Sequence, residues 1–394
     1  MIIRPFCALR PKPELAQAVA ALPYDVMNTE EAREIAAGNP HSFLRVDKAE
    51  IDLPAGTDPY SQAVYDKAKE NLRSLADSGV LVQDDAPALY IYRLEANGRV
   101  QTGLAACVSV AEYEQGLIKR HEFTRPDKEA DRVNHIKACS AHTGPIFMAY
   151  RDEGQRDLIT EWVSGHKPIY DFEAEDKVRH TMWIVDDLKA QEKLIQSFAE
   201  VPYFYIADGH HRNEAARKVA ADGESQYYLA TLFPHDELAI MDYNRVVSEI
   251  TEDFISNVKK AAKVEKSDVP VKPDRKHVAG MYAAGQWYRL TFEIEGESDV
   301  IDCLDVSVLQ NKILSPILGI KDQKTDKRID FVGGIRGLTE LERRVDSGEM
   351  AVAFSMYPTS MEELMAVANA NQIMPPKSTW FEPKLRSGLL VHVF

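Results

Sequence analysis

The chain has 394 residues, a formal net charge of −15 at pH 7 and four cysteines, none in a C-x-x-C pair. This charge disfavours nucleic acid as a partner, since such binding relies on basic residues that neutralise phosphates. No stretch is long and apolar enough to span a bilayer, and the N-terminus lacks the apolar region of a secretory signal. Isolated cysteines are typical of reduced thiols, so we expect a cytoplasmic protein with no membrane partner.

The first part of the chain places an acid after an early strand. Residues 2–9 alternate loosely between apolar and polar, which predicts that strand. The loop Pro23-Tyr24-Asp25-Val26 follows, ahead of a predicted helix over about 29–37. We interpret Asp25 as a substrate-binding residue, and an ordinary turn residue is the open alternative.

The next segments predict scaffold. Helical spacing of apolar residues over 58–77 indicates a helix that Gly79 ends. Residues 89–94 and 104–110 read as neighbouring strands across an Asn97-Gly98 turn, which is a strong hairpin signal. A sheet therefore begins here.

A dense polar block runs from Gly116 to His135, and Pro126 begins its predicted helix. Glu122 lies beside His121 at the end of a short extended stretch, where a carboxylate could take a proton from a substrate hydroxyl. We therefore predict Glu122 and His121 as catalytic and Arg132 as substrate-binding. The alternative is that residues 121–132 form a solvated network of salt bridges.

The most informative stretch is the apolar run 203–207 and the polar residues directly after it. Strands are expected before it, near 144–150, 167–172 and 180–185. An apolar run over 203–207 stops at Asp208-Gly209, and an amphipathic segment begins at once, which predicts strand, tight turn and helix. Gly209 allows positive φ, and the first N–H groups of the helix would face an anion. We predict Asp208 as a catalytic residue and metal ligand. Phosphate-binding residues are predicted to be Gly209, His210, His211 and Arg212. The alternative is that Asp208 only caps the helix and the histidines are solvated.

From about residue 247 the composition changes to a polar helix, a connection rich in Lys and Pro, and alternating strands. We expect three regions: a main α/β domain over 1–246, a small α+β insert over 247–330, and a segment over 331–394 that returns to the main domain. Arg245 precedes the change, and it could contact a phosphate or make a structural pairing.

The third polar block, Met374 to Lys384, contains three prolines, two lysines and two hydroxyl residues. Lysines meet phosphates as point charges, and hydroxyls and N–H groups complete such a site. We predict phosphate or nucleotide binding by Lys377, Ser378, Thr379 and Lys384. The alternative is a rigid connector that packs Trp380 and Phe381 into the core.

Several blocks resemble known families. In order along the chain, PYDV, RHEFTRPDKEADR, ADGHHR, LDVSVLQNKILSPILGI and MPPKSTWFEPKL resemble a bacterial and archaeal domain-of-unknown-function family, number ten-fifteen. The turn from Asp208 to Arg212, with Ala215 and Ala216 after it, resembles the phosphate-binding turn of the ParB and sulfiredoxin superfamily, which includes nucleotide-dependent kinases of free serine. This second resemblance implies a ParB/sulfiredoxin-like core sheet with helices.

Together the three polar blocks would supply a carboxylate base, a metal-binding aspartate and cationic or N–H donors, which phosphoryl transfer requires. We therefore predict a kinase that uses Mg²⁺ and ATP or ADP to phosphorylate a small hydroxyl-bearing metabolite. The resemblance implies an acceptor like free serine. Two alternatives stay open: a nucleotide-binding regulatory module without turnover, and a metal-dependent hydrolase that uses His121, Glu122, His210 and His211.

Overall fold

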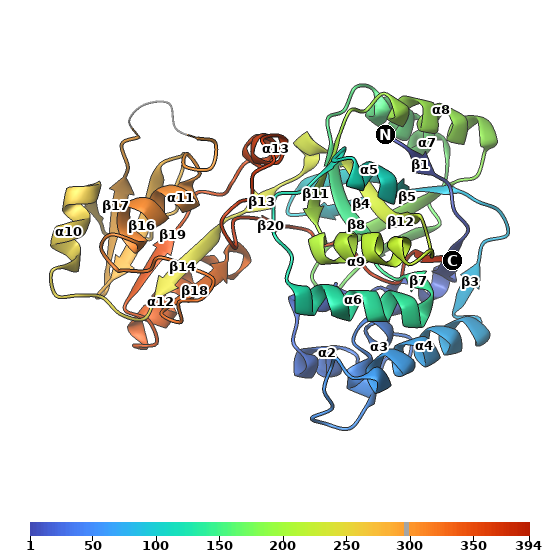
Figure 1. Cartoon of the computed structure of the whole chain (residues 1–394), viewed down its shortest axis with the longest axis horizontal. Helices are drawn as coiled ribbons and strands as arrows, with labels where there is room; N and C mark the ends of the chain where they lie inside the picture. The colour runs from blue at the N-terminus through green and yellow to red at the C-terminus, as the bar shows by residue number, and fades with distance from the viewer. Residues whose placement is uncertain (295–298) are drawn as a thin grey trace. The chain divides into compact units, whose positions relative to one another are not determined.

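The computed structural model describes residues 1–294 and 299–394, which form two units (Figure 1). Unit 1 contains Met1–Leu238 and Pro383–Phe394, and unit 2 contains Ala239–Glu382. Unit 1 combines helices with a mixed sheet, and the described strands of unit 2 pair antiparallel beside helices, so the predicted mixed α/β class is confirmed. Positions 295–298 of the expected insert lie outside the described residues.

Unit 1 is built on a mixed sheet whose described strands have the order β6-β11-β8-β12-β5-β4-β10-β9, with β1 paired to β5. Its centre is β4 (Leu89–Ala96) and β5 (Arg99–Ser109), an antiparallel pair across the predicted Asn97-Gly98 turn. The other strands are β1 (Ile3–Arg4), β6 (Ile118–Lys119), β8 (Ile146–Tyr150), β9 (Tyr170–Glu173), β10 (Arg179–Val185), β11 (Phe204–Asp208) and β12 (Tyr227–Pro234).

One face of this sheet carries the larger core. Alternate strand residues such as Leu104, Met148 and Ile206 point into it and are almost fully buried, as the period of two in a strand requires. Helices cover this face with residues such as Leu194 and Ala216. These helices are α5 (Val110–Glu114), α7 (Gln155–Gly165), α8 (Leu188–Ala199) and α9 (His210–Ala221).

A second core joins the first third of the chain to the end of the chain. The early strand expected over 2–9 is split at Pro5 into β1 and β2, because proline cannot donate to a ladder. Helix α6 (Pro126–Cys139) lies alongside α9 (Figure 1). The remaining elements are α1 (Ala16–Val19), α2 (Thr29–Ile35), α3 (Leu44–Asp47) and α4 (Gln62–Asp77), with strands β2 (Ala8–Pro11), β3 (Leu81–Gln83), β7 (Ala141–His142) and β21 (Val391–Val393) in the order β3-β2-β21-β7.

Short 3₁₀ turns connect these elements: Pro13–Leu15, Tyr24–Val26, Ala49–Asp52 and His235–Glu237. Asn28 caps α2 through the Glu31 N–H, in the capping box that begins this helix. Among the residues described here, no helix combines the length and the apolar character needed to cross a membrane.

Among its described residues, unit 2 has a six-stranded sheet in the order β15-β17-β16-β19-β14-β18 and a separate pair, β13 with β20. The strands are β13 (Ile240–Met241), β14 (Tyr243–Val247), β15 (Lys263–Ser267), β16 (Val278–Ala283), β17 (Gln286–Thr291), β18 (Ile329–Gly333), β19 (Val352–Ser355) and β20 (Trp380–Phe381). The helices are α10 (Phe254–Ala261), α11 (Asp305–Leu309), a π-helix (Gln310–Leu314), a 3₁₀ turn (Gly334–Arg336), α12 (Gly337–Asp346) and α13 (Met361–Asn369).

The unit boundaries differ from the regions expected from the sequence. Residues 239–246 and 331–382, which we assigned outside the insert, belong to unit 2. The reason is strand pairing: β14 lies between β18 and β19, and β19 also pairs with β16. Residues on both sides of the expected boundaries therefore share one ladder.

Candidate functional site

The strand, turn and helix predicted around Gly209 form as expected. Strand β11 ends at Asp208, Gly209 has φ +97°, and α9 begins at His210. The Asn213 N–H closes the first helical bond on the Gly209 carbonyl at 2.9 Å. The N–H groups of residues 210–212 have no acceptor among the described residues, so the positive end of α9 presents donors to an anion.

Arg212 folds back onto this turn. Its Nη1 donates to the Pro145 carbonyl at 2.6 Å, and its Nη2 lies 3.3 Å from Asp208 Oδ2. A Cβ atom at Gly209 would lie only 3.1 Å from Arg212 Nε. The Arg212 guanidinium therefore packs against the turn and stabilises it. Glycine is needed at position 209 both for the positive φ and for this close approach of the guanidinium.

Asp208 lies between two cations. Its Oδ2 faces Arg212, and its Oδ1 lies 3.5 Å from Lys384 Nζ. Burial alone would raise the pKa of Asp208, but the charges of Lys384 and Arg212 outweigh burial and lower it. Asp208 is therefore ionised at neutral pH, and the structure brings it together with Lys384, which is 176 positions away in the sequence.

His121 and His210 form a buried pair. Their rings meet edge to face with centroids 4.5 Å apart, and their exposed fractions are 1% and 6%. Burial lowers the pKa of His121 to about 4 and lowers the pKa of His210 well below its usual value. Both rings are neutral at pH 7, so they contribute hydrogen-bonding atoms rather than positive charge. His210 Nε2 is buried without a partner among the described residues.

Glu122 lies at the same corner. Its Oε2 is 3.7 Å from His210 Nδ1, and its side chain is 48% exposed while that of His210 is 5% exposed. Parallel pairing of β6 with β11 explains this proximity, because it brings the ends of both strands to one edge of the sheet. A solvent-accessible carboxylate therefore stands beside the donor-rich turn.

Asp25 and His211 lie on the outer side of the turn. The Arg125 N–H donates to His211 Nε2 at 3.1 Å. Burial lowers the pKa of His211, and the charges of Asp25 and Glu129 act against that shift. Asp25 is therefore close enough to influence His211, although the two residues come from distant segments.

Arg132 is buried below the turn. Its guanidinium lies over the Tyr24 ring at 3.9 Å, and its Nε donates to Asp131 Oδ2 at 3.0 Å. Arg132 and Arg212 both line a small cavity of about 20 Å³, which has room for roughly one water. The Thr143 hydroxyl donates to Asp47 Oδ1 at 2.8 Å there.

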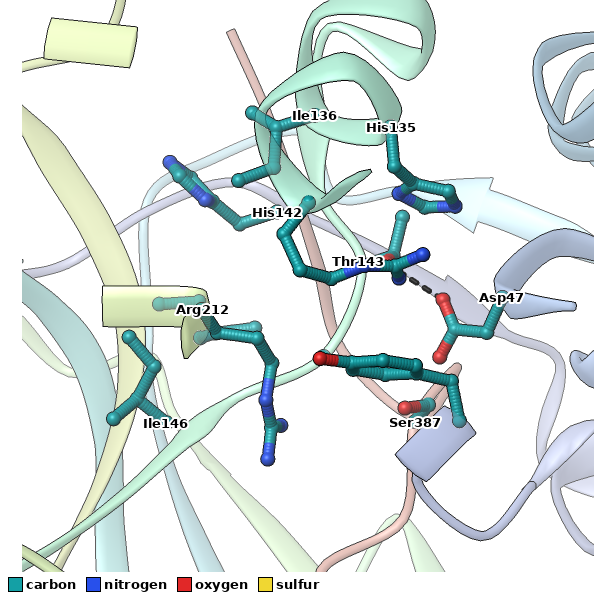
Figure 2. A pocket seen from close by; sticks show the side chains of 12 residues that line it. Asp47, His135, Ile136, His142, Thr143, Ile146, Arg212 and Ser387 are labelled. Atoms are coloured by element: carbon teal, nitrogen blue, oxygen red, sulfur yellow. Dashed lines mark hydrogen bonds between the residues drawn. The ribbon is translucent and has the colours of Figure 1, made fainter. Parts of the chain in front are cut away.

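Figure 2 shows the arrangement of this cavity, with Arg212 and Ile146 on one side and Asp47 and His135 on the other. A space of this size does not hold a metabolite. A substrate contact by Arg132 would require the cavity to widen, and the role of this residue stays a prediction.

The third polar block is divided between the units. Lys377, Ser378 and Thr379 belong to unit 2, whereas Lys384 belongs to unit 1. Within unit 2 the Ser378 hydroxyl donates to the Pro375 carbonyl at 2.7 Å. Phosphate binding by the three residues of unit 2 stays a prediction.

The family described as "Protein of unknown function (DUF1015)" matches residues 3–307. The chain belongs to this family. The family predicted from the ordered blocks is thereby confirmed. The match includes the polar blocks at 121–132 and 208–212 of this DUF1015 protein, and it ends before the third block.

Solved structures give distant likenesses to the DUF1015 chain. A mutant free serine kinase in complex with AMP has a TM-score of 0.40 and 11% identity, with 73% of this chain and 91% of that chain covered. A mutant free serine kinase in complex with ADP has a TM-score of 0.39 and 12% identity, with 73% and 92% covered. A conserved hypothetical protein from Pyrococcus furiosus has a TM-score of 0.38 and 14% identity, with 73% and 95% covered.

These TM-scores carry no argument about the activity of the DUF1015 chain. No curated protein matches it. The functional argument therefore rests on the geometry of its own residues.

The DUF1015 chain has one important residue that sequence reasoning missed. Arg386 is buried, its Nε donates to His180 Nε2 at 3.2 Å, and its backbone N–H lies 3.4 Å from the Tyr92 hydroxyl. A further ion pair joins it to Asp176. Arg386 thus anchors the segment that carries Lys384. The sequence feature that could have pointed to Arg386 is the pattern Lys384-Leu385-Arg386, in which two cations flank an apolar residue.

Metal binding was the remaining expectation. Among the described residues, no group of three or more His, Cys, Asp or Glu side chains is arranged to hold a metal ion. The hydrolase alternative stays a prediction. Mg²⁺ needs fewer protein ligands, since nucleotide phosphates supply the rest. Asp208 does not fit that role here, because both of its oxygens already face cations.

Proposed function

We propose that this protein is a nucleotide-dependent kinase that phosphorylates a small hydroxyl-bearing metabolite. The observation that carries the proposal is the position of Glu122, whose carboxylate lies 3.7 Å from His210 at the rim of the Gly209 turn. Phosphoryl transfer requires donors that neutralise phosphate charge and a base beside the acceptor hydroxyl. This corner supplies both kinds of group.

The phosphates are proposed to bind at the turn itself. The N–H groups of residues 210–212 point outward from the positive end of α9, and His210 and His211 add neutral ring atoms. Arg212 and Lys384 add positive charge, while the bonds of Arg212 to Asp208 and the Pro145 carbonyl preserve the shape of the turn. Separately, within unit 2, we propose Lys377, Ser378 and Thr379 as phosphate ligands.

Glu122 is proposed as the base that takes the proton from the acceptor hydroxyl. His121 packs against His210, and His210 lies beside Glu122, so the two neutral rings position the carboxylate. For Asp208 we propose the orientation of Lys384 and of the acceptor, not metal binding. Asp25 and Arg132 are proposed to contact the acceptor. Mg²⁺ would neutralise charge on the ATP or ADP phosphates, and free serine is the first acceptor to test.

Turnover tests this proposal directly. Purified protein is incubated with Mg²⁺, ATP or ADP and a panel of hydroxy amino acids, and phosphorylated products are measured by mass spectrometry. Glu122→Gln should lower turnover by about 10²- to 10⁴-fold and should leave nucleotide-induced thermal stabilisation unchanged. Glu161→Gln, on the exposed surface of α7, is the matched control. Absence of product with every pair of nucleotide and acceptor would refute the kinase.

A regulatory nucleotide-binding module is the second candidate. The observation that favours it is the set of contacts among Asp208, Arg212 and Lys384, in which two cations surround one carboxylate and would attract an anion without any catalytic step. This candidate predicts tight nucleotide binding, no turnover, and equal behaviour of wild type and Glu122→Gln. For either function we propose a cytoplasmic location, in keeping with four scattered cysteines that form no C-x-x-C pair.

A further inference from the structure

Arg245 is a buried cation without an acidic partner. It lies on β14 of unit 2 with an exposed fraction of 0%. Its Nη2 donates to the Lys377 carbonyl at 3.1 Å and to the Pro376 carbonyl at 3.4 Å, and its Nη1 donates to the Tyr243 carbonyl. No carboxylate among the described residues forms an ion pair with it. Burying a charge without a counter-charge costs much free energy. The Arg245 guanidinium therefore carries a desolvation penalty that no ion pair offsets.

The carbonyls that Arg245 holds belong to a strained turn. Lys377 has φ +57°, a left-handed angle that side chains rarely adopt. A proline followed by a left-handed residue is typical of a type II turn, in which Gly or Asn usually occupies the second of these positions. The Ser378 hydroxyl closes the turn on the Pro375 carbonyl at 2.7 Å. Lysine is therefore present where glycine would fit better.

The cation–π contact of Lys377 with Tyr243 does not require a lysine in a left-handed conformation. The Lys377 Nζ lies 5.5 Å from the centroid of the Tyr243 ring and makes no ion pair within the described residues. The backbone N–H groups of Lys377 and Ser378 also have no acceptor among those residues. Two cations and two N–H donors thus gather at one turn, in a chain of net charge −15.

We propose that the Pro375–Thr379 turn of unit 2 is a phosphate-binding turn. In it, Lys377 provides the charge, the N–H groups of Lys377 and Ser378 donate to phosphate oxygens, and Arg245 is a positioning residue that holds the turn through its carbonyls. The anion supplies the counter-charge that Arg245 lacks. The inference rests on the proposed function only for the class of ligand, which is a phosphate-bearing small molecule.

A purely structural role for Lys377 gives a different expectation. Glycine at position 377 removes the backbone strain, so Lys377→Gly should raise the melting temperature under either interpretation. Only the phosphate-binding interpretation also predicts weaker anion binding. Lys177→Gly is the matched control, because Lys177 is a second lysine with left-handed φ, at +65°, and it lies in unit 1 with 82% of its side chain exposed.

The test uses the full chain with inorganic pyrophosphate at constant ionic strength. Hydrogen exchange of the peptide spanning residues 374–382 gives a readout at this turn that is separate from the Gly209 turn. Pyrophosphate should slow exchange there in wild type and Lys177→Gly. In Lys377→Gly the concentration required should rise at least about tenfold, since one charge-assisted contact is lost.

Arg245→Met should weaken the same local protection without changing the side chain of Lys377. Arg245→Lys, which keeps the charge but loses the fork that reaches two carbonyls, is measured if Arg245→Met does not fold. Protection that is absent in wild type, or unchanged in Lys377→Gly, would overturn the inference.

The outcomes separate this inference from the kinase proposal. Turnover with an unchanged response in Lys377→Gly removes the phosphate-binding turn and leaves the kinase. Lost protection in Lys377→Gly without any turnover leaves the phosphate-binding turn and removes the kinase.

Discussion

Gly209→Ala is the substitution that tests the candidate site most directly. Gly209 has φ +97°, and an alanine there would adopt a left-handed angle at a cost of about 1–2 kcal/mol. Its Cβ would also stand 3.1 Å from Arg212 Nε, so the guanidinium must move by a few tenths of an ångström, which disturbs its contacts with Asp208 and the Pro145 carbonyl. We expect the melting temperature of unit 1 to fall by roughly 2–8 °C.

The effect on nucleotide binding should be larger than the effect on stability. A shifted backbone misaligns the N–H groups of α9, and the loss of one or two charge-assisted hydrogen bonds should weaken binding about 10- to 100-fold. The assay is the thermal shift with ATP and with ADP, confirmed by titration calorimetry. Gly154→Ala is the control, because Gly154 precedes α7 with φ +116° and has open space around its Cβ position.

The control variant should lose similar stability and keep the wild-type affinity. The reasoning would be refuted if Gly209→Ala bound nucleotide as tightly as wild type, or if both variants lost affinity equally. In the first case the turn does not contact the ligand. In the second case the loss reflects stability alone.

Three further predictions concern the surroundings of the turn. Arg386→Met removes the contacts of the guanidinium with His180 and Asp176, so it should lower the free energy of unfolding by about 1–3 kcal/mol and weaken nucleotide binding, as measured by urea unfolding and calorimetry. Lys384→Met removes a charge that lowers the pKa of Asp208. The ionised Asp208 carboxylate contributes stability above about pH 4, and this contribution is lost as the pH falls through the folded pKa. In Lys384→Met the contribution should be smaller, as measured by urea unfolding from about pH 3 to 7. His121 has a folded pKa of about 4 against 6.5 when unfolded, so the unfolded state binds more protons and unfolding free energy should fall by about 3 kcal/mol between pH 6.5 and 4, with a smaller slope in His121→Gln.

The local chemistry of the turn was readable from the sequence. The apolar run before Asp208 and the glycine after it restrict the backbone within a few residues, so strand, turn and helix could be predicted together. The proximity of Glu122 was a weaker expectation, because it depends on pairing between Phe204 and Ile118, which sequence periodicity does not specify.

The role of Arg212 shows why the rest could not be predicted. Arginine after such a turn favours a phosphate contact, but its guanidinium also meets the Pro145 carbonyl and Asp208, and the carbonyl comes from another part of the sheet. The boundaries of unit 2 failed to follow from composition for the same reason. Tyr243–Val247 joins that unit through ladders to β18 and β19, which lie many residues further along the chain.

The pairing of β13 with β20 also affects how unit 1 folds. Ile240 lies opposite Phe381 and Met241 opposite Trp380, so residues near the start and the end of unit 2 are held beside each other. Once β13 and β20 have paired, the polypeptide between Leu238 and Pro383 acts as a short loop within unit 1. Most of the conformational entropy that closing a long loop costs has then already been lost. Insertions and deletions inside unit 2 should therefore leave the folding rate of unit 1 almost unchanged, whereas separating this pair would slow the docking of the last strand.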